Sequence, residues 1–335
     1  VAGEDNDVTF DGNVNLNNGG TISLSGAGLV GESVSITGTI NGSSSLTVTA
    51  GGNGNVSFGD QIGNAIRLAS LNVSGDAGIS IDGSSVRTTG NQTFIDAVVI
   101  STDTTFDADA GNITFNSTLQ GTAAGGSDNL VIDAGTGTLT IADAVGSGGN
   151  IGTVDLVAGT LTQNGVVTAQ DAVTINASAS AFIDQSLTSG GTTTIVAAGD
   201  NNGTIPFRLG NAATLTSTAG MLTIQSDDMT LSGTINATGQ TVLLRQNSDN
   251  EAIEIGSNGG TNDELELSST ELNSITADLL RIGHSGAGNI DITSNVTLAS
   301  APVLSLVTGG VITDSGAGSI AATNLAIQAA GTVTL

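Results

Sequence analysis

The amino-acid sequence predicts an all-β protein built as a single-stranded parallel β-helix, or β-solenoid. Three observations predict it: short apolar–polar–apolar alternations recur along all 335 residues, Gly- and Asn-rich turns separate them, and aromatic residues make up only 2% of the chain. A period of two places the apolar side chains on one face of a strand. Gly and Asn accept the backbone conformations that tight turns require.

The segment 46–58, LTVTAGGNGNVSF, shows the pattern once. Leu46 and Val48 lie two apart in the first predicted strand, Val56 and Phe58 lie two apart in the second, and 51–55 supply the turn. The same apolar triplet recurs at 8–10, 14–16, 22–24, 34–36, 79–81, 113–115, 139–141, 173–175, 222–224, 229–231, 290–292 and 333–335. Short strands joined by such turns indicate a sandwich, a barrel or a solenoid.

Chain length favours the solenoid among these three architectures. A single sandwich or barrel rarely exceeds about 250 residues, whereas a solenoid grows by adding coils. At roughly 20 residues a coil, the chain would form about 16 coils. We expect residues 1–335 to be one continuous solenoid and a segment of a longer protein. A row of smaller β-sandwiches is the alternative, because the strand spacing is uneven.

The segment 268–283, SSTELNSITADLLRIG, carries the strongest helical signal in the chain. Leu272, Ile275 and Leu279 are spaced as on one face of a short helix. Because LLRIG and the following GNIDIT resume the alternation, we interpret the segment as strands.

The balance of acidic and basic residues narrows the classes of partner that the protein could bind. Five Arg and no Lys stand against 31 acidic residues, which gives a net charge of −26. Such a surface repels nucleic-acid phosphates and anionic lipids, so neither nucleic acid nor a membrane surface is a predicted partner. No apolar run is long enough to span a membrane. The absence of Cys excludes disulfides and thiolate chemistry.

Catalytic residues are not predicted, and we expect the protein not to be an enzyme. His284 is the only histidine, and its surroundings, RIGHSGAG, predict an exposed turn with a structural role. Parallel β-helices can host sugar-cleaving enzymes that need two nearby carboxylates. A carbohydrate-active enzyme is therefore the less favoured alternative, since the chain has no Tyr or Trp to stack on a sugar.

Acidic turns are candidate calcium ligands, because Ca²⁺ prefers oxygen donors. We expect no cofactor, and Ca²⁺ is the alternative. The candidate ligands are Asp227, Asp228, Asp249, Glu251, Asp263 and Glu264, and similar acidic turns occur at 3–7 and 107–112. The simpler interpretation is that these carboxylates keep a Gly-rich chain soluble and prevent lateral strand pairing.

The run from Glu271 resembles a known class of sequences. It contains ELNSITADLLRIGHSGAGNIDITSNVTLASAPVLSLVTGGVITDSGAGSIAATNLAIQAAGTVTL, and it is similar to the repetitive passenger regions of large bacterial surface exoproteins. These are the filamentous-haemagglutinin-like adhesins of two-partner secretion and related β-strand-repeat proteins. The resemblance is general over the whole chain and sharpest here. The amino-terminal secretion domain of that family, with its Asn-Pro motif, is absent from the sequence.

This resemblance implies a right-handed parallel β-helix, export through an outer membrane, and a place outside the cell or on its surface. We therefore expect a structural or adhesive rod of a secreted bacterial surface protein. Its partners would be neighbouring segments of the same protein, further copies, or a host or cell-surface receptor. A self-assembling extracellular filament is the alternative, because the strand pattern continues to Leu335 without a polar capping repeat.

Overall fold

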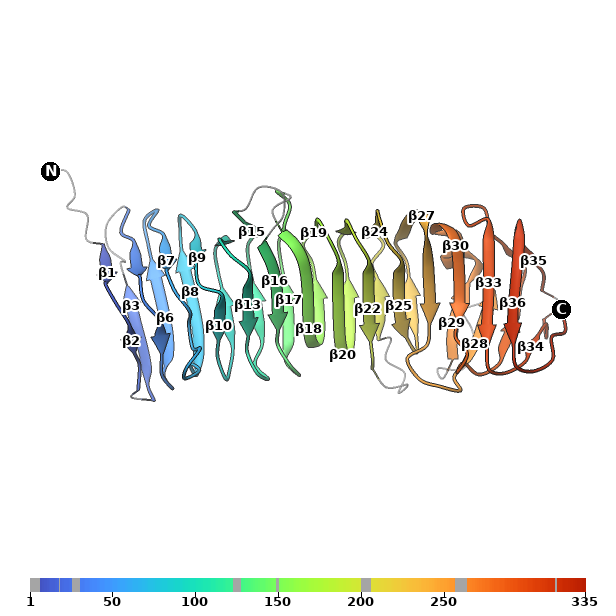
Figure 1. The fold of residues 1–335 in the computed structure, drawn as a ribbon, viewed down its shortest axis with the longest axis horizontal. Coiled ribbons are helices and arrows are strands. Elements are labelled where there is room, and N and C mark those ends of the chain that lie inside the picture. The colour runs from blue at the N-terminus through green and yellow to red at the C-terminus, as the bar shows by residue number, and fades with distance from the viewer. Residues whose placement is uncertain are drawn as a thin grey trace. The chain divides into compact units, whose positions relative to one another are not determined.

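Parallel β-strands dominate the computed structural model of the chain, so the predicted β-solenoid is confirmed (Figure 1). The structure describes residues 7–17, 19–25, 31–122, 128–148, 151–199, 206–256, 264–316 and 318–335. The chain divides into two compact units, Val1–Asp171 (unit 1) and Ala172–Leu335 (unit 2). Each unit is itself a stack of coils and is described separately.

Unit 1 contains only strands among its described elements. They are β1 (Val8–Phe10), β2 (Val14–Asn15), β3 (Thr21–Ser25), β4 (Val34–Ile36), β5 (Ile40–Asn41), β6 (Ser45–Ala50), β7 (Val56–Phe58), β8 (Ser70–Gly75), β9 (Ile79–Ile81), β10 (Ser85–Arg87), β11 (Gln92–Phe94), β12 (Val98–Ile100), β13 (Thr104–Asp107), β14 (Ile113–Phe115), β15 (Leu119–Gly121), β16 (Asp128–Asp133), β17 (Thr138–Ile141), β18 (Ile151–Gln163) and β19 (Val167–Ala169).

Unit 2 adds one short helix to its strands. Its elements are β20 (Val173–Ile183), β21 (Leu187–Ser189), β22 (Thr193–Ala197), β23 (Phe207–Leu209), β24 (Thr214–Ser217), β25 (Leu222–Ser226), β26 (Met229–Leu231), β27 (Thr234–Arg245), β28 (Ala252–Gly256), β29 (Glu264–Ser268), α1 (Ser269–Asn273), β30 (Ile275–Gly283), β31 (Ile290–Ile292), β32 (Val296–Thr297), β33 (Val303–Thr308), β34 (Ile312–Thr313), β35 (Ile320–Ala321) and β36 (Asn324–Ala329).

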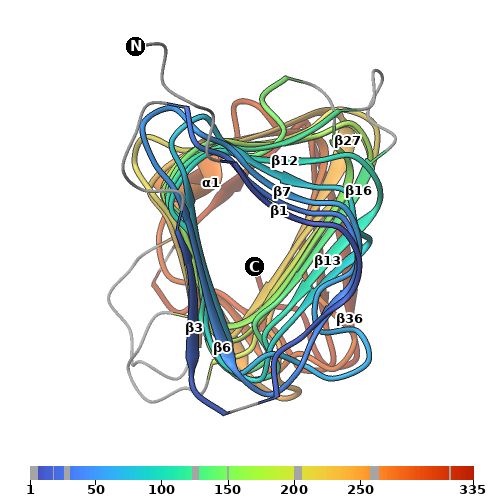
Figure 2. The same ribbon diagram turned by 90° about the vertical axis from the view of Figure 1, so that its left-hand side faces the viewer.

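Three walls surround the core of unit 1 (Figure 2). One wall is the sheet β1-β4-β7-β9-β12-β15. A second runs from β3 through β6, β8, β11, β14 and β17 to the last residues of β18. The third contains β10, β13, β16 and the first residues of β18. All of these pairings are parallel, so each coil lies directly on the one before it.

The strand register gives the coil length. Val8 pairs with Val34, 26 positions later, and Val34 pairs with Val56, 22 positions later. Thr214 in unit 2 pairs with Thr234, 20 positions later. Turns of variable length absorb these differences without disturbing the ladders. Coils are therefore mostly longer than the expected 20 residues, and the estimate of 16 coils is too high.

Each inward-facing position forms a buried row across successive coils. Val48, Val73, Phe94, Phe115 and Ile141 make one such row in unit 1, and each of them is at most 1% exposed. Aliphatic side chains fill most rows because a stack of identical coils has space for one medium-sized side chain at each position.

A phenylalanine cluster occupies the middle of unit 1. Phe94 and Phe115 lie on adjacent coils and stack with ring centroids 4.9 Å apart. Phe106 on the facing wall meets both rings edge to face, at 5.2 Å from Phe94 and 5.1 Å from Phe115. These geometries are the favourable ones for aromatic pairs, and all three side chains are fully buried.

The coil order is interrupted between β27 and β30 of unit 2. Ile235 on β27 pairs with Ile275 on β30, 40 positions later, and the chain between them forms β28, β29 and α1. The sheet order is β29-β28-β31-β34. The chain therefore steps backwards after β28, so that β29 lies on the side of β28 that faces away from β31.

The interpretation of 268–283 as strands is wrong for its first part. Residues 269–273 form α1, and the strand β30 begins only at Ile275. The helix forms because Ser268 and Glu271 make a capping box: the Ser268 hydroxyl accepts the Glu271 N–H, and the Glu271 carboxylate accepts the Ser268 N–H. No helix among the described residues is long and apolar enough to cross a membrane.

The phenylalanine cluster yields the first prediction. Phe106→Ala should lower the free energy of unfolding of unit 1 by about 3–5 kcal/mol, because it removes a buried ring and leaves a cavity against two others. Phe10→Ala is the matched control, since Phe10 is 37% exposed and its loss should change stability by less than about 0.5 kcal/mol. Urea unfolding followed by circular dichroism measures both. Equal effects of the two substitutions would contradict the packing described here.

Candidate functional site

Asp227 is the most enclosed of the candidate calcium ligands. Its side chain belongs to a residue only 3% exposed. One carboxylate oxygen accepts the N–H groups of Asn247 and Ser248, each at 2.6 Å, and the other accepts the Ser248 hydroxyl at 2.7 Å. The Asp227 carboxylate thus holds the turn after β27 in the next coil.

The other candidates are dispersed. Asp228 follows Asp227, and burial raises the pKa of its carboxyl, with the nearby Glu271 charge adding to the effect. The Asp249 side chain is 78% exposed. Glu264 begins β29 opposite Ala252. Glu251 precedes β28, and its carbonyl accepts a hydrogen bond from Gln246 Nε2 at 2.7 Å. Asp263 lies outside the described residues. Across the described chain, no three acidic or histidine side chains are grouped as metal ligands.

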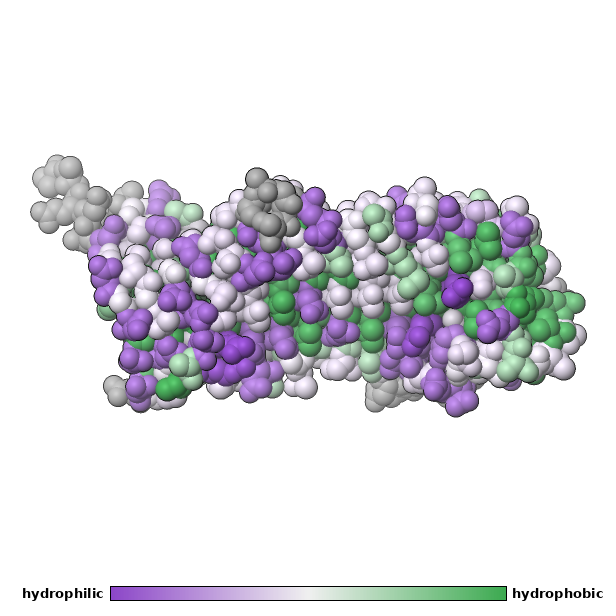
Figure 3. All heavy atoms as spheres, viewed as in Figure 1, coloured by the Kyte–Doolittle hydropathy of each residue, from purple (hydrophilic) through white to green (hydrophobic). Residues whose placement is uncertain are grey.

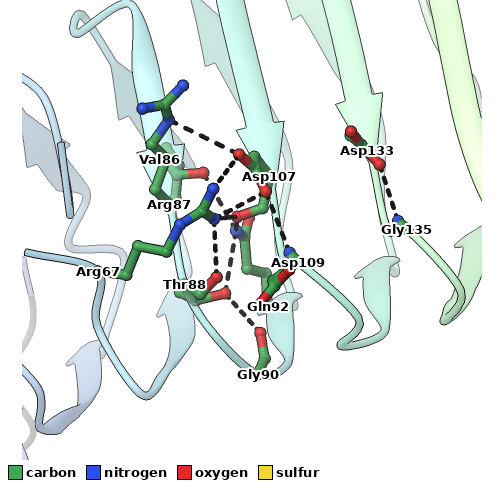
Figure 4. Close-up of polar contacts among 10 residues, drawn as sticks. All are labelled: Arg67, Val86, Arg87, Thr88, Gly90, Gln92, Asp107, Asp109, Asp133 and Gly135. Carbon is green, nitrogen blue, oxygen red and sulfur yellow. Dashed lines mark hydrogen bonds and ion pairs between the residues drawn. The ribbon is translucent and has the colours of Figure 1, made fainter.

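The most developed polar cluster of the described chain lies at a corner of unit 1 and contains two of the five arginines (Figure 4). Arg67 donates from Nη1 to Asp107 Oδ1 at 2.7 Å and from Nη2 to Asp107 Oδ2 at 2.5 Å. This two-point geometry is the strong form of an Arg–carboxylate pair. Arg87 Nε lies 3.7 Å from the same Asp107 carboxylate.

The Arg67–Asp107 pair crosses an entire coil. The two residues are 40 positions apart, and the coil between them contributes Thr88, whose carbonyl accepts a further hydrogen bond from Arg67 Nη1 at 3.0 Å. Three successive coils are therefore joined by one guanidinium. In an ordinary solenoid each coil contacts only its neighbours, so this contact adds a longer-range connection.

A buried glutamine completes the corner. Gln92 is fully buried, and its Nε2 donates to the Val86 carbonyl at 3.1 Å, to the Thr88 hydroxyl at 3.2 Å and to the Asp107 carbonyl at 2.9 Å. The Asp107 carbonyl also accepts the Thr88 N–H at 2.9 Å, so Gln92 adds a second donor there. Its side-chain amide thereby links three acceptors at the buried corner, where polar groups need hydrogen-bond partners.

The corner geometry repeats in the next coil. Asp107 Oδ1 accepts the N–H of Asp109, and Asp133 Oδ1, one coil later, accepts the N–H of Gly135 (Figure 4). Asp109 and Gly135 both have positive φ, 57° and 55°. A Cβ at Gly135 would lie 1.7 Å from the Asp109 carbonyl oxygen, so this position requires glycine.

The Arg67 interaction changes the titration of Asp107. Its hydrogen bonds lower the pKa of the Asp107 carboxyl below the ordinary value of 3.8, although partial burial acts in the opposite direction. The same hydrogen bonds raise the pKa of Arg67. Both groups therefore stay charged at neutral pH. Because the Asp107 carboxylate is engaged by two arginines, the cluster stabilises the corner and offers no free nucleophile or base.

Unit 2 has a more exposed pair of the same type. Arg208 Nη2 donates to both carboxylate oxygens of Asp184, at 2.9 and 2.7 Å, and its guanidinium lies 4.8 Å from the centre of the Phe182 ring. Its side chain is 45% exposed. Solvent screens such a pair more strongly than the Arg67–Asp107 pair.

His284 is less exposed than its sequence context predicts. It does follow β30 in a turn, as expected, but its side chain is only 16% exposed. The imidazole Nδ1 accepts the Gly286 N–H at 3.1 Å, which draws the ring against the turn. The expectation of an exposed histidine is therefore wrong, because the ring folds back to accept a hydrogen bond from the main chain of its own turn.

The sequence alone does not indicate the Arg67–Asp107 cluster. Its pattern places Asp107 among the acidic turns that could bind calcium, because the two-coil interval that brings Arg67 to Asp107 is visible only once the register is known. No protein-family model matches the chain, and neither a curated protein nor a solved structure shows significant similarity to it.

The corner cluster yields a prediction about stability. Asp107→Asn should lower the free energy of unfolding of unit 1 by about 1.5–3 kcal/mol at pH 7, because it removes charge-assisted hydrogen bonds and leaves Arg67 half-buried without its counter-ion. Asp184→Asn, in the exposed pair, should cost about 0–1 kcal/mol in unit 2. Denaturant unfolding, with hydrogen exchange to separate the units, measures both.

The same cluster sets an acid dependence. The pKa of Asp107 is lower in the folded chain than in the unfolded chain. Its contribution to the free energy of unfolding is therefore complete above the pKa of the unfolded chain, and it is lost as the pH falls through the pKa of the folded chain. Between pH 5 and pH 2, roughly the window expected for such a carboxylate, unit 1 of the Asp107→Asn variant should therefore lose less stability on acidification than unit 1 of the wild type. An unchanged acid dependence in the variant would contradict the assignment.

Proposed function

We propose that the chain is a structural and adhesive segment of a secreted bacterial surface protein, located outside the cell. The observation that carries this proposal is the parallel main-chain ladder that continues from coil to coil within each unit, from β3 to β18 along one wall of unit 1, for example. A ladder of this kind makes a stiff element from a simple repeated sequence. Its role would be to project or present a surface.

The outer surface of unit 1 supports an adhesive role. Thr93, Thr114, Thr140 and Thr162 occupy equivalent outward positions on four successive coils, and each is partly exposed. Their hydroxyls therefore recur at about 4.8 Å, the spacing of adjacent strands. A regular row of donors and acceptors suits a partner that is itself repetitive, such as a receptor glycan or a neighbouring copy.

The acidic charge supports an extended, solvated state. With 31 acidic residues and a net charge of −26, neighbouring chains repel each other and exposed strands are less prone to pair sideways. The resemblance of the sequence from Glu271 onward to bacterial surface exoproteins leads to the same proposal for its location.

End-to-end assembly is the second candidate function, and one feature of unit 2 favours it. Hydrophobic residues gather over the part of the molecule that Figure 1 labels β33 and β36 (Figure 3). Leu325 and Ile327 continue the buried rows of Leu304 and Leu306, yet they are 42% and 38% exposed. A further coil would cover them and pair with the outer edge of β36, and in end-to-end assembly that coil belongs to another copy.

Resistance to force tests the structural role. A chain held at both ends should unravel coil by coil, with extension steps of about 70–90 Å, the extended length of one coil. Asn116→Pro should make unit 1 unravel at lower force, because it deletes the hydrogen bond of 2.9 Å from the Asn116 N–H to the Phe94 carbonyl of the preceding coil.

Asn116→Ala is the control for this measurement. Its side chain is exposed and alanine keeps the N–H, so the force should equal that of the wild type. Single-molecule force spectroscopy gives both values. Loss of a whole unit in one low-force event would count against a mechanical role.

Sedimentation tests the assembly candidate. The purified chain should form concentration-dependent oligomers, and the double variant Leu325→Lys with Ile327→Lys should remain monomeric, because lysine on an open edge opposes strand pairing. Ile66→Lys with Ile95→Lys makes the same charge change at positions 52% and 42% exposed in unit 1 and should still assemble. A monomeric wild type at every concentration would exclude assembly through this edge.

A further inference from the structure

Unit 2 contains a pocket lined by basic side chains. Its volume is about 290 Å³, and its walls include Arg245, Arg281, His284, Ser285 and Gln328. Three of the six basic side chains of the sequence therefore meet at one place in a chain of net charge −26. No acidic residue is among those that line it.

A glycine forms part of the pocket lining on the sheet surface. Leu243 and Leu244 on β27 pair with Arg281 and Ile282 on β30, so Arg245 comes beside Gly283. Gly283 in turn pairs with Val307 on β33. It has a positive φ of 83°, and a Cβ there would lie 2.3 Å from the Val307 carbonyl oxygen. This position therefore requires glycine, and Gly283 lies in the pocket lining together with Arg245 and Val307.

The two arginines of the pocket lack counter-ions. Arg67 and Arg87 pair with Asp107, and Arg208 pairs with Asp184. Within the described part of the chain, by contrast, neither Arg245 nor Arg281 forms an ion pair. Arg245 Nε is enclosed and has no hydrogen-bond partner there. The positive charges of both arginines thus have no described counter-ion, so a ligand that brings negative charge to the pocket would bind favourably.

His284 adds a titratable group to the same wall. Its Nδ1 accepts the Gly286 N–H, so the neutral ring carries its proton on Nε2, an enclosed atom with no hydrogen bond to a described residue. Burial and then the Arg245 charge lower the pKa of His284, while Asp249, the Ser248 main chain and Asp227 act in the opposite direction. An arriving negative charge would favour the protonated ring.

We propose that this pocket binds an oxyanion, a carboxylate, sulfate or phosphate group, carried by a ligand about the size of one sugar unit. The guanidinium groups of Arg245 and Arg281 hold the anionic oxygens. Ser285 and Gln328 lie in the same lining, where they can exchange hydrogen bonds with ligand hydroxyls, and Leu243 and Val307 supply apolar contact. The inference is independent of the structural role proposed above.

The single histidine makes a sensitive test. Its imidazole proton signals are unique in the NMR spectrum, because His284 is the only histidine of the chain. Titration with sodium glucuronate, at ionic strength held constant with sodium chloride, should shift these signals saturably and raise the pKa of His284. Sodium sulfate should do the same, and neutral glucose should not.

Charge-matched variants locate the site. Arg245→Gln and Arg281→Gln should each weaken binding about tenfold or more, as expected for loss of a charge-assisted contact. Arg208→Gln makes the same change of net charge away from the pocket and should bind like the wild type. Arg245→Lys keeps the positive charge and serves as a folding control. Its far-ultraviolet circular dichroism spectrum should show the same β-sheet signal as that of the wild type.

The outcomes separate the ligand sources. Tighter binding of glucuronate than of sulfate assigns the site to an acidic sugar, and equal binding assigns it to the oxyanion alone. The proposal is overturned if glucuronate and sulfate move the His284 signals no more than sodium chloride does, or if Arg208→Gln weakens binding as much as Arg245→Gln.

Discussion

The parallel ladder between coils is the constraint on which the rest of the structure depends. Because each residue lies on its counterpart one coil away, the choice of residue at one position limits the choice at the next. Phe94 can be large because Phe115 stacks flat against it. Gly135 must be small because the Asp109 carbonyl lies where a side chain would begin. Packing, turns and polar contacts all follow from this superposition.

Polar groups are placed where the ladder leaves the backbone unsatisfied. Gln92 supplies donors to corner carbonyls in unit 1, and the Glu271 carboxylate in unit 2 accepts the Leu231 N–H at 2.9 Å while also capping α1. Such residues are buried and hydrogen-bonded, which is the usual condition for polar groups inside a protein. The five arginines occupy two kinds of site: three form ion pairs with carboxylates, and two line the pocket beside His284.

The fold could be predicted from the sequence because alternation is a local signal, visible in segments such as 46–58. Local patterns also explain the errors. The capping box at Ser268 and Glu271 favours one helical turn between β29 and β30. The spacing of apolar residues does not reveal that this turn is preferred over a continued strand. The contact of Arg67 with Asp107 depends on coil lengths that vary, for example between 20 and 26 residues in two of the pairs quoted. The place of Arg245 beside Gly283 depends on a longer interval, because Leu243 on β27 pairs with Arg281 on β30, 38 positions later. Without the register, neither basic cluster could be located.

The backward step at β29 has a consequence for how unit 2 is made. A solenoid in which every coil follows the last in sequence can grow in the order of synthesis or export, each new strand adding to a finished edge. Here β28 pairs with β29 on one side and with β31 on the other, although β29 comes later in the chain than β28. Strand addition along this wall therefore cannot be strictly sequential. Unit 2 contains a point at which assembly must wait for the next strand along the chain, because Ala252 on β28 pairs with Glu264 on β29, 12 positions later, before the wall can close.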